Sequence, residues 1–411
     1  MRILYISKYT ILPEHGAATR QYFISKALSE MPGNEVMLIG SRSTLGSVPS
    51  FKGPSRSSNE GRLTRVTLNG PSVNAGFNLK RLYSWIVFEK NLWRFRSYIK
   101  SFKPDVIIVS SLSILTFVTG VLLKRLLRVP LVVEVRDIYP LTLIEVGGYS
   151  PSHPAVRLLS RVEKFGYRNA DLILSTLPNL PMHVETIIGS RFQFKWLPMG
   201  VDPSYFETKE NATVSFKKPG EFWVGYAGTV GVANALNELF EAASILEHSH
   251  PQIKFAIIGD GPLREMYRQN FGHLSNLQFF DAVPKKQLQA YLVQMDLLVN
   301  TWMDKSIYRF GISPNKWIDY MLSARPLLVA FSGHPCIIDE AGCGVFVKAE
   351  DKQSIAKGII DFYNMPSAQR DAMGAAGKKY LLENLDYKIL SNDLYQSLTE
   401  LTGKKKSLVD E

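Results

Sequence analysis

The chain is poor in cysteine: its 411 residues contain two, Cys336 and Cys343, and no Cys-x-x-Cys pair. Two isolated cysteines do not build a disulfide scaffold or a cluster of zinc ligands, so both are disfavoured and a reducing, cytoplasmic environment is expected. Hydrophobic residues make up 45% and charged residues 21%, as in ordinary globular proteins. The length leaves room for two or three domains, each with its own core.

Long uncharged segments are also scarce, and residues 106–123 are the one stretch that reaches the length of a membrane-spanning helix. The stretch begins with four β-branched residues and continues with serines, threonines and a glycine. We interpret it as a buried strand, a small-residue loop and a helix to Arg128, in preference to a transmembrane segment. No signal peptide is visible, because the apolar start of the chain runs directly into a Lys-containing turn.

Positive charge is concentrated in the first half. The formal net charge is +11, yet residues 1–205 hold 26 Lys and Arg against 13 Asp and Glu, and the remainder is slightly acidic. A polyanion or a membrane surface is therefore expected beside the first half. Residues 78–103 hold seven of these cations, interleaved with aromatic residues, against Glu89 alone. This helical segment either lies on an anionic bilayer or buries its aromatics and solvates its basic face.

Short apolar runs alternate with helical patterns along the chain. Strands are expected at 2–7, 35–39, 105–110, 131–135 and 172–175, and again at 222–227, 254–259, 277–280, 297–300 and 327–330. Helices are expected between them, for example at 17–30, 236–247 and 285–294. This alternation predicts an α/β fold with two doubly wound, Rossmann-like domains whose strand ends face a central cleft. Residues 42–62, rich in Ser, Gly, Arg and Pro, are predicted to form a mobile loop.

Three loops of the second half follow strands or open a helix. Residues 225–231 and 259–262 are glycine-rich, so a ligand can approach their backbone. In the third, Ser313 is expected as a helix N-cap and Pro314 as the first helical residue, which makes Lys316 the third. A cation sits badly at this positive end of a helix. Either an anion such as phosphate occupies the site, or Lys316 pairs with Asp319 on the same face.

Two loops of the first half also follow strands. Residues 16–20 lack the spaced glycines of a dinucleotide fingerprint, which argues against NAD or FAD. Arg136 and Asp137 place opposite charges directly after the strand expected at 131–135. They either form a structural ion pair or reach into the cleft and contact the reacting groups.

Taken in order, the segments 16–20, 134–137, 198–202, 225–231, 259–262 and 313–320 resemble the motifs of GT-B glycosyltransferases of family 4. The chain is similar to the bacterial O-antigen and capsule enzymes grouped around N-acetyl-fucosamine transferases. The resemblance implies a GT-B fold, with an acceptor-binding domain at 1–203 and a domain for the nucleotide sugar at 204–385. A C-terminal helix within 386–411, with a basic tail, is expected to pack back toward the first domain.

The resemblance also implies roles for residues. Asp319 matches the second acid of the family's E-x7-E motif, which holds the ribose hydroxyls, whereas the first acid falls on Gly311. Thr229 stands where many relatives have a phosphate-binding arginine, and Asn234 lies near their usual lysine. Lys316, Arg309 and the helix N-terminus are then the candidates to neutralise the diphosphate. The implied donor-binding set is Gly228, Thr229, Gly259, Asp260, Gly261, Arg309, Gly311, Ser313, Pro314, Asn315, Lys316 and Asp319.

On the acceptor side the resemblance implies Gly16, Thr19 and Arg20, and for the reaction itself Asp137, Arg136 and Lys316. It implies a retaining transfer without a covalent protein nucleophile. No Asp-x-Asp occurs in the chain, so no metal and no other cofactor are expected.

The expected donor is a UDP-sugar carrying an N-acetylated amino sugar, and the expected acceptor is a lipid-linked saccharide used in surface polysaccharide synthesis. The enzyme would lie peripherally on the inner face of the plasma membrane. Two alternatives stay open, a GT-B sugar-nucleotide epimerase and a basic nucleic-acid-binding protein. The second leaves the loops of the near-neutral half unexplained, so nucleic acid is not the expected partner.

Overall fold

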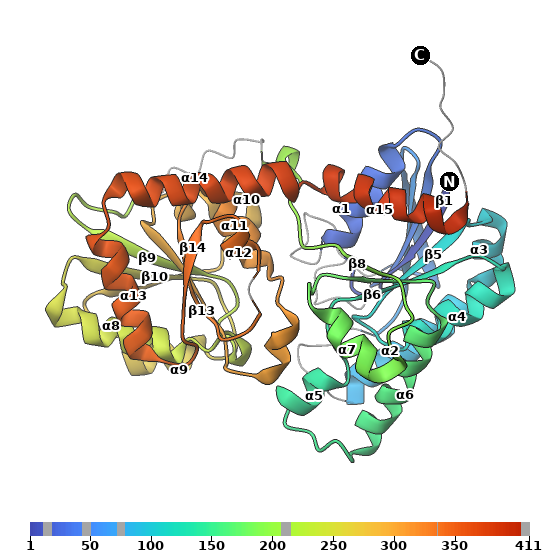
Figure 1. The fold of residues 1–411 in the computed structure, drawn as a ribbon, viewed down its shortest axis with the longest axis horizontal. Helices are drawn as coiled ribbons and strands as arrows, with labels where there is room; N and C mark the ends of the chain where they lie inside the picture. Colours follow the sequence, from blue (N-terminus) through green and yellow to red (C-terminus); the bar gives the residue numbers. More distant parts are fainter. Residues whose placement is uncertain (11–18, 43–50, 72–78, 207–214, 335, 404–411) are drawn as a thin grey trace. The chain divides into compact units, whose positions relative to one another are not determined.

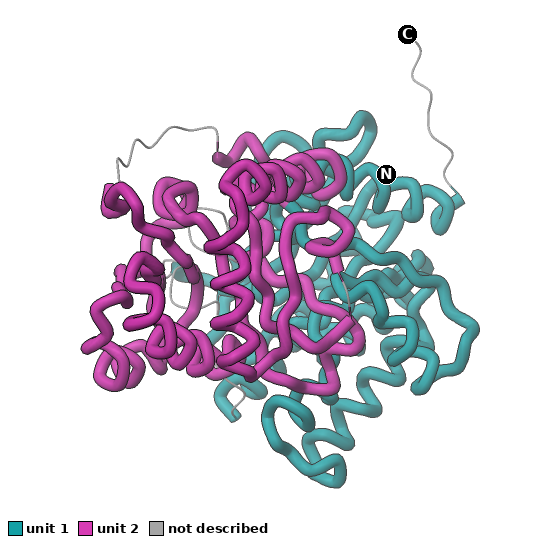
Figure 2. Tube along the Cα trace, turned by 60° about the vertical axis from the view of Figure 1, so that its left-hand side comes forward, with its two compact units in different colours: residues 1–200, 387–411 teal, residues 201–386 magenta. Residues whose placement is uncertain are grey.

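The computed structural model describes residues 1–10, 19–42, 51–71, 79–206, 215–334 and 336–403. The chain divides into two compact units (Figure 2). Unit 1 comprises Met1–Gly200 with Tyr387–Glu411, and unit 2 comprises Val201–Asp386. These boundaries differ by only a few residues from the expected limits at 203 and 385.

Unit 1 is built on an eight-stranded sheet with the order β3-β4-β2-β1-β5-β6-β7-β8. Neighbouring strands are parallel, except that β3 and β4 are antiparallel. The central strands are buried along nearly their whole length, as parallel strands covered on both faces should be. The strands are β1 (Arg2–Ile6), β2 (Glu35–Ser41), β3 (Ser55–Glu60), β4 (Leu63–Leu68), β5 (Val106–Ser110), β6 (Leu131–Val135), β7 (Leu172–Ser175) and β8 (Phe194–Trp196).

Two groups of helices pack on this sheet (Figure 1). One group joins α1 (Arg20–Glu30), which contacts β2, to the C-terminal helix α15 (Tyr387–Thr402). The other is centred on α4 (Thr116–Leu127), which contacts β5, β6 and α6. The remaining helices of the unit are α2 (Leu79–Arg94), α3 (Arg96–Phe102), α5 (Leu141–Glu145), α6 (Pro154–Asn169) and α7 (Leu180–Ile188).

Unit 2 contains a six-stranded parallel sheet with the order β11-β10-β9-β12-β13-β14. Its strands are β9 (Phe222–Ala227), β10 (Ile253–Ile258), β11 (Leu277–Phe280), β12 (Leu297–Thr301), β13 (Leu327–Ala330) and β14 (Gly344–Val347). Its helices are α8 (Asn237–Ser249), α9 (Arg264–Phe271), α10 (Lys285–Leu292), α11 (Asn315–Leu322), α12 (Ile337–Glu340), α13 (Lys352–Asn364) and α14 (Ser367–Asn384).

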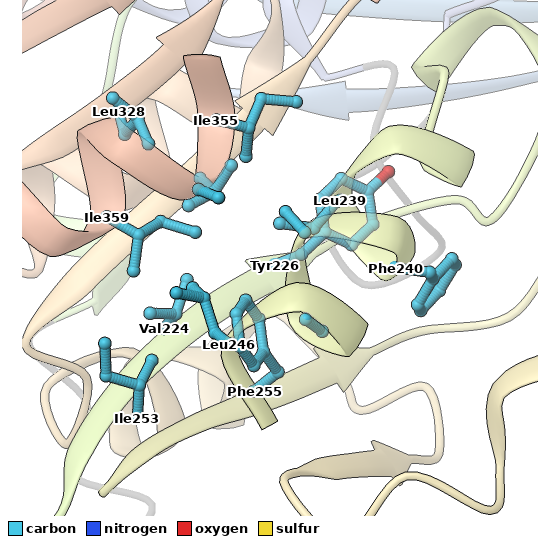
Figure 3. Packing of buried hydrophobic residues seen from close by; sticks show 14 of the residues in the cluster. Val224, Tyr226, Leu239, Phe240, Leu246, Ile253, Phe255, Leu328, Ile355 and Ile359 are labelled. Atoms are coloured by element: carbon cyan, nitrogen blue, oxygen red, sulfur yellow. The ribbon is translucent and has the colours of Figure 1, made fainter. Parts of the chain in front are cut away.

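The core of unit 2 lies where α8 and α13 cover one face of this sheet (Figure 3). Leu239 and Phe240 of α8 and Ile355 and Ile359 of α13 are fully or almost fully buried in it, beside Val224 of β9. Burying a side chain of this kind stabilises the fold by about 1.5–3 kcal/mol. Two Rossmann-like α/β units with parallel sheets are thus the observed fold, as predicted.

The sequence placed most strands well and missed others. The strands expected at 131–135, 172–175, 222–227, 277–280 and 327–330 are observed with those bounds. The loop predicted over 42–62 is wrong in its second half, because β3 (Ser55–Glu60) pairs there with β4. Its six polar residues are almost all exposed at the edge of the sheet, so no apolar alternation marks them as a strand. Residues 43–50 lie outside the described part of the chain.

The uncharged stretch at 106–123 is confirmed as a strand, a loop and a helix, namely β5 and the first part of α4. Among the helices that the structure describes, none has both the length and the apolar content needed to cross a bilayer. The basic segment at 78–103 forms two helices, α2 and α3, instead of one, and Asn78 lies outside the described residues.

Candidate functional site

Two glycine-rich loops meet at the carboxyl edge of the unit 2 sheet. They follow β9 and β10, whose last residues, Ala227 and Ile258, are partners in the sheet register. The Gly228 N–H donates to the Ile258 carbonyl at 2.9 Å, and the Val230 N–H donates to the Asp260 carbonyl at 2.9 Å. The backbones are so close that a Cβ at residue 259, where φ is +139°, would collide with the Gly228 carbonyl. Only glycine therefore permits this approach.

Lys316 of α11 brings the third loop to the same place. Its aliphatic chain crosses the Gly228 backbone, where a Cβ would collide with Lys316 Cε. The Lys316 ammonium donates to Asn234 Oδ1 and lies 5.2 Å from the centroid of the Tyr226 ring. Asn234 in turn donates through Nδ2 to the Thr229 carbonyl at 2.9 Å. The three loops that the sequence singled out thus converge on one lysine.

Burial lowers the pKa of Lys316 to about 8. Desolvation destabilises the ammonium form, in a place where the hydrogen-bond partner is an uncharged amide. A nearby anion would restore the charged form, since opposite charges stabilise one another most strongly where water is excluded. The site therefore has the electrostatics of an anion site.

The predicted start of this helix is wrong by one residue. Helix α11 begins at Asn315, its N-cap residue is Pro314, and Ser313 lies outside it. Pro314 has ψ of 143°, an extended conformation, and no side chain caps the helix. Lys316 is consequently the second helical residue, still within the positively polarised first turn.

Asp319 has a different partner from the one the sequence suggested. Its Oδ1 lies 3.2 Å from Nζ of Lys285, at the start of α10, and Gln289 Nε2 donates to its carbonyl at 3.0 Å. The interpretation that Lys316 simply pairs with Asp319 is therefore wrong. Asp319 is 8% exposed. Burial raises the pKa of this carboxyl, and the Lys285 charge partly offsets the rise.

The other residues of the predicted donor set surround this centre. Gly311 has φ of +92°, a conformation that L side chains rarely adopt, and this explains why no acid stands there. Arg309 is exposed, donates to the Ser306 carbonyl at 2.5 Å and stacks on Phe310. Asp260 is also exposed, and its Oδ1 accepts from the Gly261 N–H at 2.7 Å.

In unit 1 the structure places Arg20, which was expected on the acceptor side, in the interior. Arg20 is fully buried, forms a 3.0 Å ion pair with Glu134 and donates to the carbonyls of Leu197 and Pro198. Burial favours the neutral acid, but the charges of Arg20 and Arg136 outweigh it and hold the pKa of Glu134 below its usual value. Arg20 therefore connects β6 to the segment at residues 197–198 inside unit 1.

The described part of the chain gives no support for the other two residues predicted on the acceptor side, Thr19 and Gly16. Thr19 is 7% exposed, and its carbonyl accepts from the Phe23 N–H at 3.1 Å at the start of α1. Gly16 lies outside the described residues. Another region of unit 1 at the strand ends presents exposed side chains.

The loop after β6 is such a region. Ser111, which follows β5, fixes it: its Oγ accepts from the Arg136 N–H at 2.8 Å and from the Asp137 N–H at 3.4 Å. Asp137 is exposed, and no ion pair between Arg136 and Asp137 is present in the described structure. The Arg136 guanidinium contacts Met199 Sδ at 3.8 Å through Nη2, while its Nε and Nη1 are buried without a hydrogen-bond partner. Sequence reasoning missed Ser111, whose only signal is a small polar residue at a strand end.

Comparisons with known proteins agree for both units. Residues 25–187 match the family model described as glycosyl transferase 4-like domain, and residues 221–365 match the one described as glycosyl transferases group 1. The probable glycosyltransferase WbjE of Pseudomonas aeruginosa is 21% identical over 286 residues, which cover 67% of this chain and 70% of WbjE.

Solved structures share the fold at low identity. Sucrose-phosphate synthase from Thermosynechococcus elongatus superposes with a TM-score of 0.75 at 15% identity, covering 98% of this chain and 100% of that one. HepE from Anabaena, solved with UDP and glucose, gives a TM-score of 0.64 at 14% identity, covering 97% and 100%.

Proposed function

Because the chain belongs to the glycosyltransferases of the GT-B type, we propose that it transfers a sugar, with retention, from a nucleotide diphosphate donor bound by unit 2. The acceptor is a lipid-linked saccharide bound by unit 1. The observation that carries the proposal is the convergence of two glycine loops and α11 on Lys316.

Lys316 neutralises the donor diphosphate. Its ammonium is bonded to Asn234, which is bonded in turn to the Thr229 carbonyl. The family resemblance implies an arginine at the position of Thr229 in many relatives and a lysine near the position of Asn234. One lysine from α11 thus supplies the charge that these two positions lack. The HepE structures, which hold UDP, UDP with glucose or UDP-glucose, support a uridine diphosphate donor.

Asp319 accepts from the ribose hydroxyls, and the Lys285 ammonium beside it favours its carboxylate form in a buried position. Negative charge that develops on the departing diphosphate is stabilised by Lys316 and by the N–H groups of Thr229 and Gly231. Among the described residues neither N–H has a recorded hydrogen-bond partner, whereas those of Gly228 and Val230 are already used. Donors fixed in advance of the reaction stabilise such charge without reorganisation.

Asp137, exposed at the end of β6, contacts the acceptor hydroxyl in this proposal. Retention follows from attack on the face of the sugar that the diphosphate leaves, with no covalent protein nucleophile and no metal. The donor sugar is an N-acetylated amino sugar, and the product enters bacterial O-antigen or capsule synthesis. The weak similarity to WbjE is compatible with this bacterial setting.

The acceptor is reached at the inner face of the plasma membrane through α2 and α3. On these helices Trp85, Phe88, Leu92 and Ile99 are buried, so part of the aromatic content does form core. A second set stays exposed, consisting of Leu79, Tyr83, Ile86, Trp93 and Tyr98. Six exposed cations accompany it: Lys80, Lys90, Arg94, Arg96, Lys100 and Lys103. Exposed apolar and basic side chains on one helical segment fit an anionic bilayer surface.

The donor assignment is tested by thermal shift against UDP-, GDP- and dTDP-sugars, followed by calorimetry with the best nucleotide. A rise in melting temperature with one nucleotide class, lost on substituting Lys316, supports the proposal. The donor assignment fails if no nucleotide sugar raises the melting temperature. It also fails if the rise is the same in the unaltered chain and in a Lys316 variant.

A further inference from the structure

We propose that Arg136 and Arg81 form a binding site for the phosphate or diphosphate group of the lipid-linked acceptor. The inference rests on the proposed function, which it deepens by naming the acceptor group that unit 1 recognises. It is carried by an arginine with buried, unbonded donors at the strand ends of unit 1.

Arg136 is presented to a ligand in a fixed position. Ser111 Oγ holds its backbone N–H at 2.8 Å and also bonds the next residue of the loop, which anchors the turn to the end of β5. Two of its guanidinium nitrogens, Nε and Nη1, are buried without a hydrogen-bond partner in the described structure. The third contacts a thioether sulfur at 3.8 Å, a weak acceptor.

The buried acid Glu134 interacts electrostatically with Arg136 but accepts no hydrogen bond from it in the described structure. Glu134 already accepts from Arg20 at 3.0 Å, from the Tyr5 hydroxyl at 2.8 Å and from Gln21 at 3.4 Å. Glu134 therefore leaves the buried donors of Arg136 unbonded, which is unfavourable for a cation. An arginine fork with open donors matches the oxygens of a phosphate, which accept two parallel N–H groups.

Arg81 adds a second cation on the same side. Its guanidinium lies over the rings of Tyr9, which follows β1, and of Trp85, at 5.3 and 5.9 Å from their centroids. Trp85 packs edge-on against Tyr139, in the loop that carries Arg136, and donates to the Tyr9 hydroxyl at 2.8 Å. Both arginines interact electrostatically with Asp137, so the two positive charges flank the same carboxylate.

The lipid part of the ligand rests on the proposed function. Leu79, Tyr83 and Ile86 of α2 are exposed, at spacings that place them along one face. Arg81 is two residues from each of the first two and therefore projects from the opposite side of the helix, where it stacks on Tyr9 and Trp85. The exposed apolar face thus does not adjoin Arg81 directly, and probes with and without a hydrocarbon chain distinguish a lipid phosphate from a free anion.

The test measures binding to the full chain by calorimetry with four probes: farnesyl diphosphate, farnesyl phosphate, farnesol and inorganic pyrophosphate. The two farnesyl phosphates are expected to bind at least about tenfold more tightly than farnesol and pyrophosphate, since each of those lacks one half of the ligand. Arg136→Met and Arg81→Met should each weaken farnesyl diphosphate binding by about tenfold or more, and Arg136→Lys should recover only part of it. Arg157→Met, which removes an exposed arginine of α6, is the matched control and should bind as the unaltered chain does.

Two further readouts separate the possible failures. Arg136→Met should change the melting temperature little, because losing its charge beside Glu134 is offset by removing buried unbonded donors, and UDP affinity should be unchanged in every variant. Equal binding of farnesol and farnesyl diphosphate, or unaltered binding by Arg136→Met, would overturn the site. If Arg136→Met lost UDP affinity and kept farnesyl diphosphate affinity, the guanidinium would belong to the donor site. If pyrophosphate bound as tightly as farnesyl diphosphate, the ligand would be a free anion and not a lipid. If the unaltered chain binds no UDP, the proposed function itself fails.

Discussion

Lys285 Nζ lies 3.2 Å from Asp319 Oδ1, so the acid expected to hold the donor ribose is paired with a cation from α10 and not with Lys316, its neighbour on α11. The Asp319 side chain is almost completely buried, which raises the pKa of its carboxyl, and the Lys285 charge partly offsets the rise. Lys285 thus favours the carboxylate form, which can accept two hydroxyl groups. It also leaves the Lys316 ammonium available for a different anion.

Lys285→Met should weaken UDP binding and lower the melting temperature of unit 2, since it leaves Asp319 buried without its charge partner. A cost of about 1–3 kcal/mol is expected. Adding Asp319→Asn to this variant should recover stability, because a buried amide carries no charge to be compensated. It should not recover UDP affinity, because an amide accepts less strongly than a carboxylate from the ribose hydroxyls. Calorimetric unfolding and UDP titration of the two single variants and the double variant measure both quantities. Additive losses of stability would contradict the coupling.

Binding of UDP should take up a proton near pH 8, and this uptake should belong to Lys316. The pKa of the free lysine is about 8, so half of the ammonium groups have lost their proton at that pH. A bound diphosphate raises this pKa, and UDP affinity should therefore fall as the pH rises above about 8. Titrations in buffers of different ionisation enthalpy measure the proton uptake directly.

Lys316→Met should abolish this pH dependence and bind UDP at least about tenfold more weakly. Lys357→Met on α13, which removes an exposed lysine of the same unit, should retain both. The same pKa has a consequence for stability: between about pH 8 and 10.5 the unfolded chain holds more protons than the folded one. Lys316 thus makes unit 2 more stable as the pH rises through that range. Proton uptake that persists in Lys316→Met would assign it to another group.

The two glycine loops should respond differently to an added methyl group. Gly259→Ala places its Cβ against the Gly228 carbonyl, and since backbone cannot step aside, unit 2 should lose stability. Gly228→Ala is also strained, because φ there is +147°, but its Cβ meets the flexible end of Lys316. It should therefore lose less stability than Gly259→Ala while displacing the ammonium and weakening UDP binding. Gly231→Ala places its Cβ 3.6 Å from the Thr229 methyl, an ordinary van der Waals contact, has no positive φ and keeps the backbone N–H, and it serves as the control. Melting temperature and UDP affinity together distinguish the three; equal loss of stability at 228 and 259 would refute the distinction.

The strands and the donor loops could be predicted because their signals are local. The strands at 131–135 and 222–227 are unbroken or nearly unbroken apolar runs bounded by turn residues, which only a sheet buried on both faces accommodates. Edge strand β3 has no such run, since its side chains face water and its pairing depends on β4. Propensity alone does not detect a strand of this kind.

Contacts between residues far apart in the sequence could not be predicted, because they depend on how the chain folds and leave no local signal. Nothing beside Arg20 indicates that it is buried, because its partners are Glu134 and two carbonyls near residue 198. Lys285 and Asp319 are likewise brought together only when α10 packs on α11. The sequence could indicate that Lys316 needs an anion, but the fold decides which acids are already paired.

Arg20→Met should destabilise unit 1 strongly. It leaves Glu134 fully buried without its cation, a change that typically costs about 3–5 kcal/mol. The double variant Arg20→Met with Glu134→Leu should lose less than Arg20→Met alone, and UDP affinity should be unchanged in any variant that still folds. Urea unfolding of unit 1 and UDP titration test this. A stable Arg20→Met chain that loses only acceptor turnover would restore Arg20 to the acceptor side.

Replacing Lys90, Arg94 and Arg96 with Glu should release the protein from anionic vesicles. The three exposed cations lie on α2 and α3, next to exposed Trp93. Each basic residue near an anionic surface contributes about 1 kcal/mol, and reversal turns this attraction into repulsion. Co-sedimentation with vesicles of phosphatidylglycerol and phosphatidylcholine measures the bound fraction.

The matched control reverses three exposed cations of α6, Arg157, Arg161 and Lys164, which changes the net charge of unit 1 by the same amount. If net charge alone drew the chain to the vesicles, both triple variants would be released equally. If α2 and α3 form the contact, only the α2–α3 variant is released. Added salt should weaken vesicle binding of the unaltered chain, and the apolar contacts of exposed Tyr83 and Ile86 should preserve part of that binding. Continued sedimentation of the α2–α3 variant with anionic vesicles would exclude this surface as the membrane contact.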